Sequence, residues 1–322
     1  MKPIAGLALL ALAACVLALA VGATPVPLHA LLAALGSPDA PSAAIVRDIR
    51  LPRVLLAFTV GGCLGVTGAS LQALIRNPLA DPYLLGISGG AGVAAVLAIA
   101  LGLNGSWGIP LAAFVGGLGA VALVYRLSTV AGRRLDPHVL VLAGVVVSAF
   151  TGAIISAVLT LSTAEQLRNV FLWLLGGFSG ASWRTLAVFS AYAGLPLLAL
   201  FAAARSLDLL SLGTEPAQSL GLDAGRSRRL VYVAASLLTA ASVAVCGVVG
   251  FVGLVAPHAL RGLLGPGHRR LLPAVFLGSG GFLVLADAVA RTVVRPIELP
   301  VGVVTALVGV PLFAVLLRRT LR

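Results

Sequence analysis

The chain alternates between long apolar stretches and short joints that hold nearly all of its arginines. The stretches without any Asp, Glu, Lys or Arg are 54–75, 82–125, 139–164, 185–204, 230–260, 271–286 and 299–317. At about 20 residues per crossing, these stretches provide room for one or two membrane helices each. The alternation therefore predicts a polytopic membrane protein.

Composition and charge support this prediction. The 322 residues are 60% hydrophobic and only 10% charged, whereas soluble domains are about 25% charged. The formal charge of +12 raises the possibility of nucleic-acid binding, but no basic stripe with interleaved aromatic residues is present. Retention of Lys and Arg in cytoplasmic loops explains the charge better. We expect a lipid environment and no nucleic acid.

Hydropathy predicts an all-α fold with ten transmembrane helices in one transmembrane domain, residues 1–322. The expected helices are 4–22, 54–75, 84–103, 109–126, 139–161, 185–204, 230–250, 254–264, 271–291 and 300–317. The first is expected to be a retained anchor, not a cleaved signal peptide. The eighth is short enough that a broken or re-entrant element is equally compatible with it.

The distribution of arginine predicts the orientation. If the N-terminus is cytoplasmic, an even number of helices places the C-terminus there as well. Fifteen of the 22 basic residues then lie inside, as the positive-inside rule requires. The seven outer ones are Arg47, Arg50, Arg53, Arg168, Arg184, Arg291 and Arg295.

Several kinds of chemistry are missing from the sequence. Lys2 is the only lysine, so the chain lacks the P-loop Lys that an ATPase site requires. Asp287 is the only ionisable group predicted inside a span, and Arg291 four residues later is placed for a local ion pair. The four histidines lie in separate joints without metal-ligand spacing. We therefore predict no catalytic residue, no metal site and no cofactor in this chain.

Two other function classes remain as alternatives. An ion- or proton-coupled secondary transporter or channel, or a membrane enzyme, would require coupling carboxylates or a catalytic cluster within the spans. Met1 is the only methionine, and no histidine lies in the middle of a predicted span. A transported cargo is therefore expected to be a closed chelate instead of a naked metal ion.

Motifs along the chain resemble those of the FecCD family, the permease subunits of ABC importers for vitamin B12, ferric siderophores and haem. The matching segments are Arg50-Leu51-Pro52-Arg53, Gly65-Val66-Thr67-Gly68-Ala69-Ser70-Leu71-Gln72, Asn77-Pro78-Leu79-Ala80-Asp81-Pro82, Gly250-Phe251-Val252-Gly253-Leu254-Val255-Ala256-Pro257-His258 and Glu298-Leu299-Pro300-Val301-Gly302. With further matches between them, they run in the family's order from about residue 47 to 317.

The resemblance implies a type II ABC importer permease in a bacterial inner membrane. It implies a homodimer, two ATPase subunits that hold ATP and Mg, and a soluble periplasmic or lipid-anchored binding protein. Arg50, Arg53 and Arg291 match the family's docking residues for that binding protein. The alternatives are anchoring at the membrane interface and, for Arg291, the ion pair with Asp287.

The longest inward joint, 205–229, contains a short helix pattern with a proline near its start and a glycine break. By resemblance it is the segment that couples the permease to the ATPase, and the alternative is a plain connecting loop. The residues expected to carry this coupling are Glu215, Pro216, Ala217, Leu220, Gly221, Leu222 and Arg226.

The resemblance also places a gate at the inner end of the path. Its parts are the turn with Asn77 and Leu79 and the entry to the fifth helix, Pro137 and His138, where relatives often have small hydroxyl residues.

Three residues of the fifth helix are candidates for the wall of the path: Ala143, Val147 and Thr151. Ordinary helix packing is the alternative for each. The joint from Leu161 to Trp183 is expected to form a short helix near the membrane surface. In this joint, Arg168 is a candidate contact for the carboxylates of a passing haem or corrinoid, or for the binding protein.

Overall fold

The computed structural model describes residues 2–22, 24–37, 39–103, 107–129, 137–294 and 296–320. Arg295, one of the predicted outer arginines, lies outside this part. The described chain folds into helices without strands. They are α1 (Lys2–Ala20), α2 (Leu28–Gly36), η1 (Ile45–Arg50), α3 (Leu51–Ile75), η2 (Pro82–Leu85), α4 (Ile87–Ala100), α5 (Gly108–Thr129), α6 (Pro137–Thr160), α7 (Ala164–Leu174), α8 (Trp183–Ala202), α9 (Ala204–Ser211), α10 (Thr214–Ser219), α11 (Ala224–Cys246), α12 (Val252–Leu264), α13 (His268–Ala290) and α14 (Val301–Thr320).

Each of the ten predicted apolar segments is a helix. Among the described residues, seven helices are long and apolar enough to cross a membrane: those at Pro3–Ala20, Ile45–Ile75, Gly108–Thr129, Pro137–Thr160, Trp183–Ala202, Ala224–Cys246 and His268–Ala290. Three further apolar helices are shorter: Ile87–Ala100, Val252–Leu264 and Val301–Val315. The all-α, multi-pass fold is confirmed, and the count of ten crossings stays a prediction.

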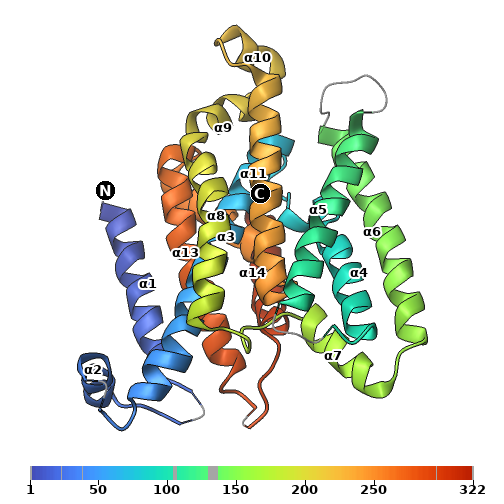
Figure 1. Ribbon diagram of the computed structural model, residues 1–322. Helices are drawn as coiled ribbons and strands as arrows, with labels where there is room; N and C mark the ends of the chain where they lie inside the picture. The colour runs from blue at the N-terminus through green and yellow to red at the C-terminus, as the bar shows by residue number, and fades with distance from the viewer. Residues whose placement is uncertain are drawn as a thin grey trace.

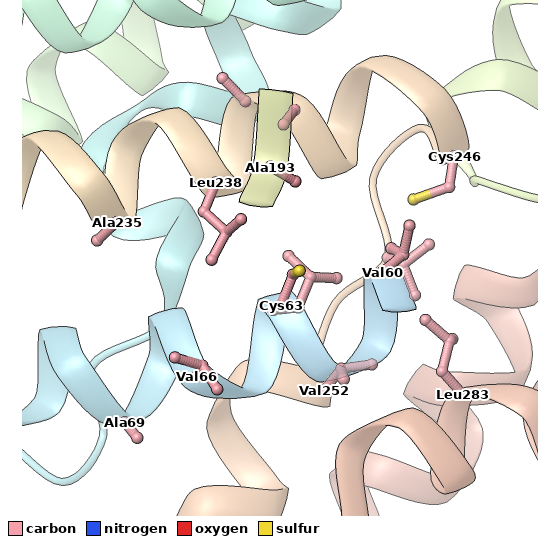
Figure 2. Close-up of a cluster of buried hydrophobic side chains, with 14 of the residues drawn as sticks. Val60, Cys63, Val66, Ala69, Ala193, Ala235, Leu238, Cys246, Val252 and Leu283 are labelled. Carbon is pink, nitrogen blue, oxygen red and sulfur yellow. The ribbon is translucent and has the colours of Figure 1, made fainter. Parts of the chain in front are cut away.

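Helix α3 is the core of the molecule. In the most apolar segment of α3, about 83% of the residues are buried inside the protein. The corresponding share is 72% for α11, 61% for α13 and only 22–28% for α1, α5, α6 and α8. Figure 2 shows how α3 contributes Val60, Cys63 and Val66 to a cluster that also holds Leu238 of α11 and Leu283 of α13. The less buried helices expose their apolar outer faces, as expected for helices that face lipid.

Glycine allows the central helices to approach closely. A Cβ atom added to Gly68 of α3 would lie 1.8 Å from the carbonyl oxygen of Gly253 in α12. One added to Gly90 of α4 would lie 2.4 Å from the carbonyl oxygen of Gly116 in α5. At these positions glycine therefore serves close helix packing.

The second predicted helix begins earlier than expected. Hydropathy placed its start at residue 54, but one turn of π-helix, η1, continues directly into α3. This segment holds Arg47, Asp48, Arg50 and Arg53, so the stretch without charged residues begins only at 54. The structure accommodates them because Arg50 and Arg53 find partners within the protein.

Short helices mark the two ends of the bundle (Figure 1). The α10 end carries α9, α10 and the beginning of α1, and the α7 end carries α2 and α7. The helices at 164–174 and 214–219 confirm two sequence predictions, whereas α2 and α9 were not predicted. Helix α7 begins with a capping box, in which Thr163 and Gln166 satisfy each other's backbone N–H groups.

Candidate functional site

At the α7 end, two arginines and two carboxylates form one network. Arg53 of α3 donates from Nη2 to Asp287 Oδ1 at 2.9 Å and to Glu298 Oε2 at 2.9 Å. Arg291 Nε lies 3.0 Å from Asp287 Oδ2. The Asp287 side chain is 1% exposed, whereas that of Glu298 is 48% exposed. The network therefore has a buried anchor, Asp287, and an accessible outer member, Glu298.

Two of the predicted docking arginines bind the end of α1. Arg50 Nη1 donates to the carbonyl oxygens of Leu19 at 2.7 Å and Ala20 at 3.2 Å, and Arg291 Nη2 donates to that of Ala18 at 3.2 Å. The last carbonyls of a helix have no partner in the helix itself and carry partial negative charge. Both arginines therefore act as caps for α1, and both are buried.

The structure thus brings Arg50, Arg53 and Arg291 to one end of the bundle but gives them different surroundings. The predicted pair between Arg291 and Asp287 is present. Arg53 and Glu298 also line a cavity of about 190 Å³ between the end of α7 and the start of α14. Of the three arginines, Arg53 is therefore the one whose accessible side faces an open cavity.

At the α10 end, α9, α10 and the first turn of α11 form a knob, in which α10 projects beyond the other helices (Figure 1). The predicted coupling residues that are exposed on it are Glu215, Pro216, Leu220, Gly221 and Arg226. Leu222 is half-buried. Ala217 is fully buried, so it supports α10 from within and is not available to a partner.

Specific contacts fix the knob. Gly213 joins α9 to α10 with φ of +115°, a conformation that favours glycine. Arg228 of α11 donates to the hydroxyl of Thr214, the first residue of α10. At the start of α11, the backbone N–H of Arg226 donates to Asp223 at 3.0 Å, which holds the pKa of that carboxyl below its usual value of 3.8. Asp223 and Arg226 also form an exposed ion pair.

The predicted gate turn follows α3. Arg76 ends that helix in the left-handed conformation, and the side chain of Asn77 accepts a hydrogen bond from the N–H of Leu79 at 2.9 Å. Both Asn77 and Leu79 are exposed. Gln72 ties the turn to α12, because it accepts from Arg261 Nη1 at 3.0 Å and lies 3.4 Å from the carbonyl oxygen of Ala80.

The other half of the predicted gate lies next to this turn. Pro137 is the first residue of α6 and lines a narrow cavity together with Leu74, from the last turn of α3. His138 beside it is exposed. The two predicted gate elements are therefore neighbours at the ends of α3 and α6.

The candidate path residues of α6 face α4. Ala143, Val147 and Thr151 are all buried, and a Cβ atom on Gly89 of α4 would lie 2.1 Å from the Thr151 hydroxyl oxygen. In this conformation they pack between helices of one subunit, and the apolar face that α6 exposes carries Leu142, Val145, Val146 and Phe150. Arg168 is exposed on α7 at the opposite end from the knob.

Sequence reasoning missed the partners of several of these groups. Glu298 stood in a quoted motif without a role, and its contact with Arg53 joins residues 245 apart in sequence. The contact of Gln72 with Arg261 joins residues 189 apart. In the described part of the chain, no group of three His, Cys, Asp or Glu side chains could hold a metal ion.

The comparisons with known proteins agree with the geometry. The FecCD transport family matches residues 9–319. The hemin transport system permease of Yersinia pestis is 41% identical over 84% of this chain and 82% of that protein. The cobalamin import system permease of Halobacterium salinarum is 43% identical over 85% and 73%. A solved structure of a proposed metal-chelate type ABC transporter, in an inward-facing conformation, matches with a TM-score of 0.89 and 33% identity over 99% of both chains.

Proposed function

The chain belongs to the FecCD transport family, and from that premise we propose that it carries a metal chelate across a bacterial inner membrane. It is the transmembrane permease subunit of an ABC importer, and a separate subunit hydrolyses ATP. It is not itself an enzyme. The alternative of an ion-coupled secondary transporter or channel is not favoured.

The mechanism rests on the knob formed by α9, α10 and the first turn of α11. A permease without an ATP site needs a surface that a separate ATPase can hold and move. The knob is such a surface, since Leu220 is 59% exposed at its tip and buried contacts fix its base. The coupling set is thus Glu215, Pro216, Leu220, Gly221, Leu222 and Arg226, with Ala217 as internal support.

The proposed cargo is haem, cobalamin or a ferric siderophore. Relatives of more than 40% identity are named as hemin and cobalamin permeases. A closed chelate also suits the chemistry of the chain, because such a cargo brings its own metal ligands and needs only small and apolar side chains along its path.

The proposed assembly is a homodimer of this chain with two ATPase subunits, which hold ATP and Mg, and a soluble binding protein. The binding protein would dock at the α7 end, near Arg50, Arg53 and Arg291. The geometry supports a division of work in which Arg53 meets an acidic group of the partner, while Arg50 and Arg291 hold α1 in place beside it. Arg168 would lie on the same side of the membrane.

The proposed gate consists of Asn77 and Leu79 after α3 together with Pro137 and His138 at the start of α6. Its position at the α10 end places it next to the knob. For the wall of the path, we propose the exposed face of α6, with Leu142, Val146 and Phe150. Ala143, Val147 and Thr151 would reach the path only if α6 separated from α4.

One experiment tests the proposal as a whole. The chain is expressed with its ATPase partner, purified as a complex and reconstituted in proteoliposomes, with hemin and cyanocobalamin as separate probes. We expect uptake that requires ATP and is stopped by vanadate. Uptake that persists without the ATPase and follows a proton gradient would contradict the proposal.

A substitution at the tip of the knob tests the coupling surface. Leu220→Asp should abolish copurification of the ATPase, because it places a charge in the proposed contact. Leu161→Asp is the matched control, since Leu161 is 88% exposed in the joint between α6 and α7, and this variant should retain the ATPase. Retention of the ATPase by both variants would argue against the knob as its binding surface.

A further inference from the structure

A partly buried polar contact joins the knob to α13. Asp208 of α9 accepts a hydrogen bond from the backbone N–H of His268 at 2.8 Å, and the same oxygen, Oδ1, lies 2.7 Å from His268 Nδ1. The histidine side chain is 4% exposed and the aspartate side chain 41% exposed. Sixty residues separate the two in sequence, so nothing in the local sequence pattern predicts the contact.

Asp208 caps α13 from another helix. Gly267, which precedes α13, has no side chain to accept from the free N–H groups of the first turn. Asp208 supplies the missing acceptor, and its negative charge is favourable at a helix N-terminus. A carboxylate oxygen only accepts, so the imidazole donates from Nδ1 to Asp208.

On the side of the knob, the connection is short and fixed. Leu207 and Leu210 of α9 are fully buried, and only Leu212 and Gly213 separate α9 from α10. The contact between Thr214 and Arg228 holds the first residue of α10 against α11. We therefore expect a displacement of α10 to be passed to Asp208.

On the other side, α13 continues through Pro273 as a single helix of 23 residues, about 34 Å long at 1.5 Å per residue. At its far end Asp287 pairs with Arg53 of α3, and Arg291 directly follows the helix. The network at the α7 end and the contact at the α10 end are thus connected by one continuous element.

We propose that Asp208 and His268 form the joint through which movement of α10 is passed to α13 and on to the charged network at the α7 end. This inference rests on the proposed function, because it takes the ATPase to act on α10. It makes Asp208 and His268 positioning residues for coupled transport. The alternative is a contact that only stabilises the fold.

The test measures movement and ATP hydrolysis in the same complex. In a background with Cys15, Cys63 and Cys246 replaced by Ala, spin labels are placed at Leu161 and Val293, both exposed. The distance between the labels is measured in the complex with the ATPase, without nucleotide and after trapping with ATP and vanadate. The parent complex should show a change in distance on trapping.

Asp208→Ala should lower the fraction of complexes that undergo this change at least about twofold, the lower end of the effects typical of a lost coupling contact, while ATP hydrolysis continues. Asp208→Asn is the matched rescue, because its carbonyl oxygen still accepts from both His268 N–H groups, and it should retain the change. Asp208→Ala combined with His268→Phe removes the joint without leaving a buried polar ring unpaired, and it should behave like Asp208→Ala.

Two outcomes distinguish a failure of this inference from a failure of the proposed function. If either variant that removes the joint hydrolyses ATP and shows the full change in distance, the contact only stabilises the fold and the inference is wrong. If the parent complex does not bind the ATPase or shows no ATP-dependent change, the proposed function itself fails.

Discussion

Asp287 pairs with two arginines at the α7 end. Its two oxygens face the guanidinium groups of Arg53 and Arg291, and almost none of its side chain is exposed. Breaking a buried ion pair from one side typically costs about 3–5 kcal/mol, because the remaining charge stays buried without compensation. A surface ion pair contributes about 0–1 kcal/mol.

We therefore predict that Asp287→Ala lowers the free energy of unfolding by about 3 kcal/mol, whereas Glu298→Ala changes it by less than about 1 kcal/mol. Both carboxylates bind Arg53, but only Asp287 is buried, so a comparison of the two variants measures the effect of burial. Thermal unfolding of the purified protein in detergent measures the difference. Equal effects of the two variants would show that Asp287 is not the anchor of the network.

We predict that Asp81, which follows the proposed gate turn, makes stability depend on pH. It accepts a hydrogen bond from the N–H of Tyr83 at 2.8 Å, which favours the charged carboxylate, but burial outweighs this and raises its pKa to about 6 from the usual 3.8. Between these two values the folded protein binds more protons at this site than the unfolded chain does. Asp81 therefore makes stability fall as pH rises from about 4 to about 6.

Asp81→Asn should remove this dependence while keeping an acceptor for Tyr83. We predict that the Tm of the parent protein falls more than that of the variant between pH 4.5 and pH 7. Other titrating groups act equally on both proteins, so the difference between the two curves isolates Asp81. Parallel curves would contradict a raised pKa at this position.

The sequence identified the arginines of the α7 end, but it did not predict most of the groups that they bind. Motifs identified Arg50, Arg53 and Arg291, and helical spacing predicted the pair of Arg291 with Asp287, which the structure confirms. The contacts of Arg53 join residues more than 200 positions apart, and no periodicity in one sequence carries such information. Burial of Arg50 was also not predictable, because it depends on where α1 ends.

At the scale of helices, hydropathy located all ten apolar segments because lipid imposes a strong and simple constraint. It failed at boundaries and for short helices. Helix α3 begins within a charged segment whose arginines are satisfied by other helices, and α9 is only eight residues long with a mixed composition. Both features depend on tertiary contacts, which composition does not reveal.

Close packing of α3 against α12 leads to a prediction with a matched control. A methyl group on Gly68 would collide with the backbone of Gly253, whereas one on Gly119 of α5 meets nothing within 4 Å. Gly68→Ala should destabilise the protein by about 1–3 kcal/mol or more, as overpacking does. Gly119→Ala should be neutral or stabilising by up to about 1 kcal/mol, because Ala favours a helix.

Thermal unfolding of the two variants in the same detergent checks this prediction. A loss of stability in Gly119→Ala equal to that in Gly68→Ala would mean that backbone proximity between α3 and α12 is not the cause.

At the scale of the whole molecule, the two proposed contact surfaces lie at opposite ends of the bundle. The knob at the α10 end has exposed residues on a fixed base, and the α7 end presents a charged network around a cavity. α3 and α13 both reach the network, and α13 also contacts α9. The two ends are therefore connected through two of the three most buried helices. A rigid core of this kind transmits displacement better than the peripheral helices would.

The proposed binding protein would dock at the α7 end. Glu298 occupies the accessible side of Arg53, so an acidic group of the partner would have to compete with it. Arg53→Ala should weaken association and make it less dependent on salt, because one charge pair across the interface is lost. Glu298→Ala should strengthen association, since it frees Arg53 and removes a like charge.

Arg50→Ala separates docking from folding in the same assay. Its guanidinium caps α1, so we expect a lower Tm with a smaller change in affinity than Arg53→Ala produces. Affinity of the purified permease for the binding protein is measured at two ionic strengths for all three variants. If Arg53→Ala binds as tightly as the parent protein at low ionic strength, Arg53 does not dock the partner. If Arg50→Ala weakens binding more than Arg53→Ala does, the proposed division of work between the arginines is wrong.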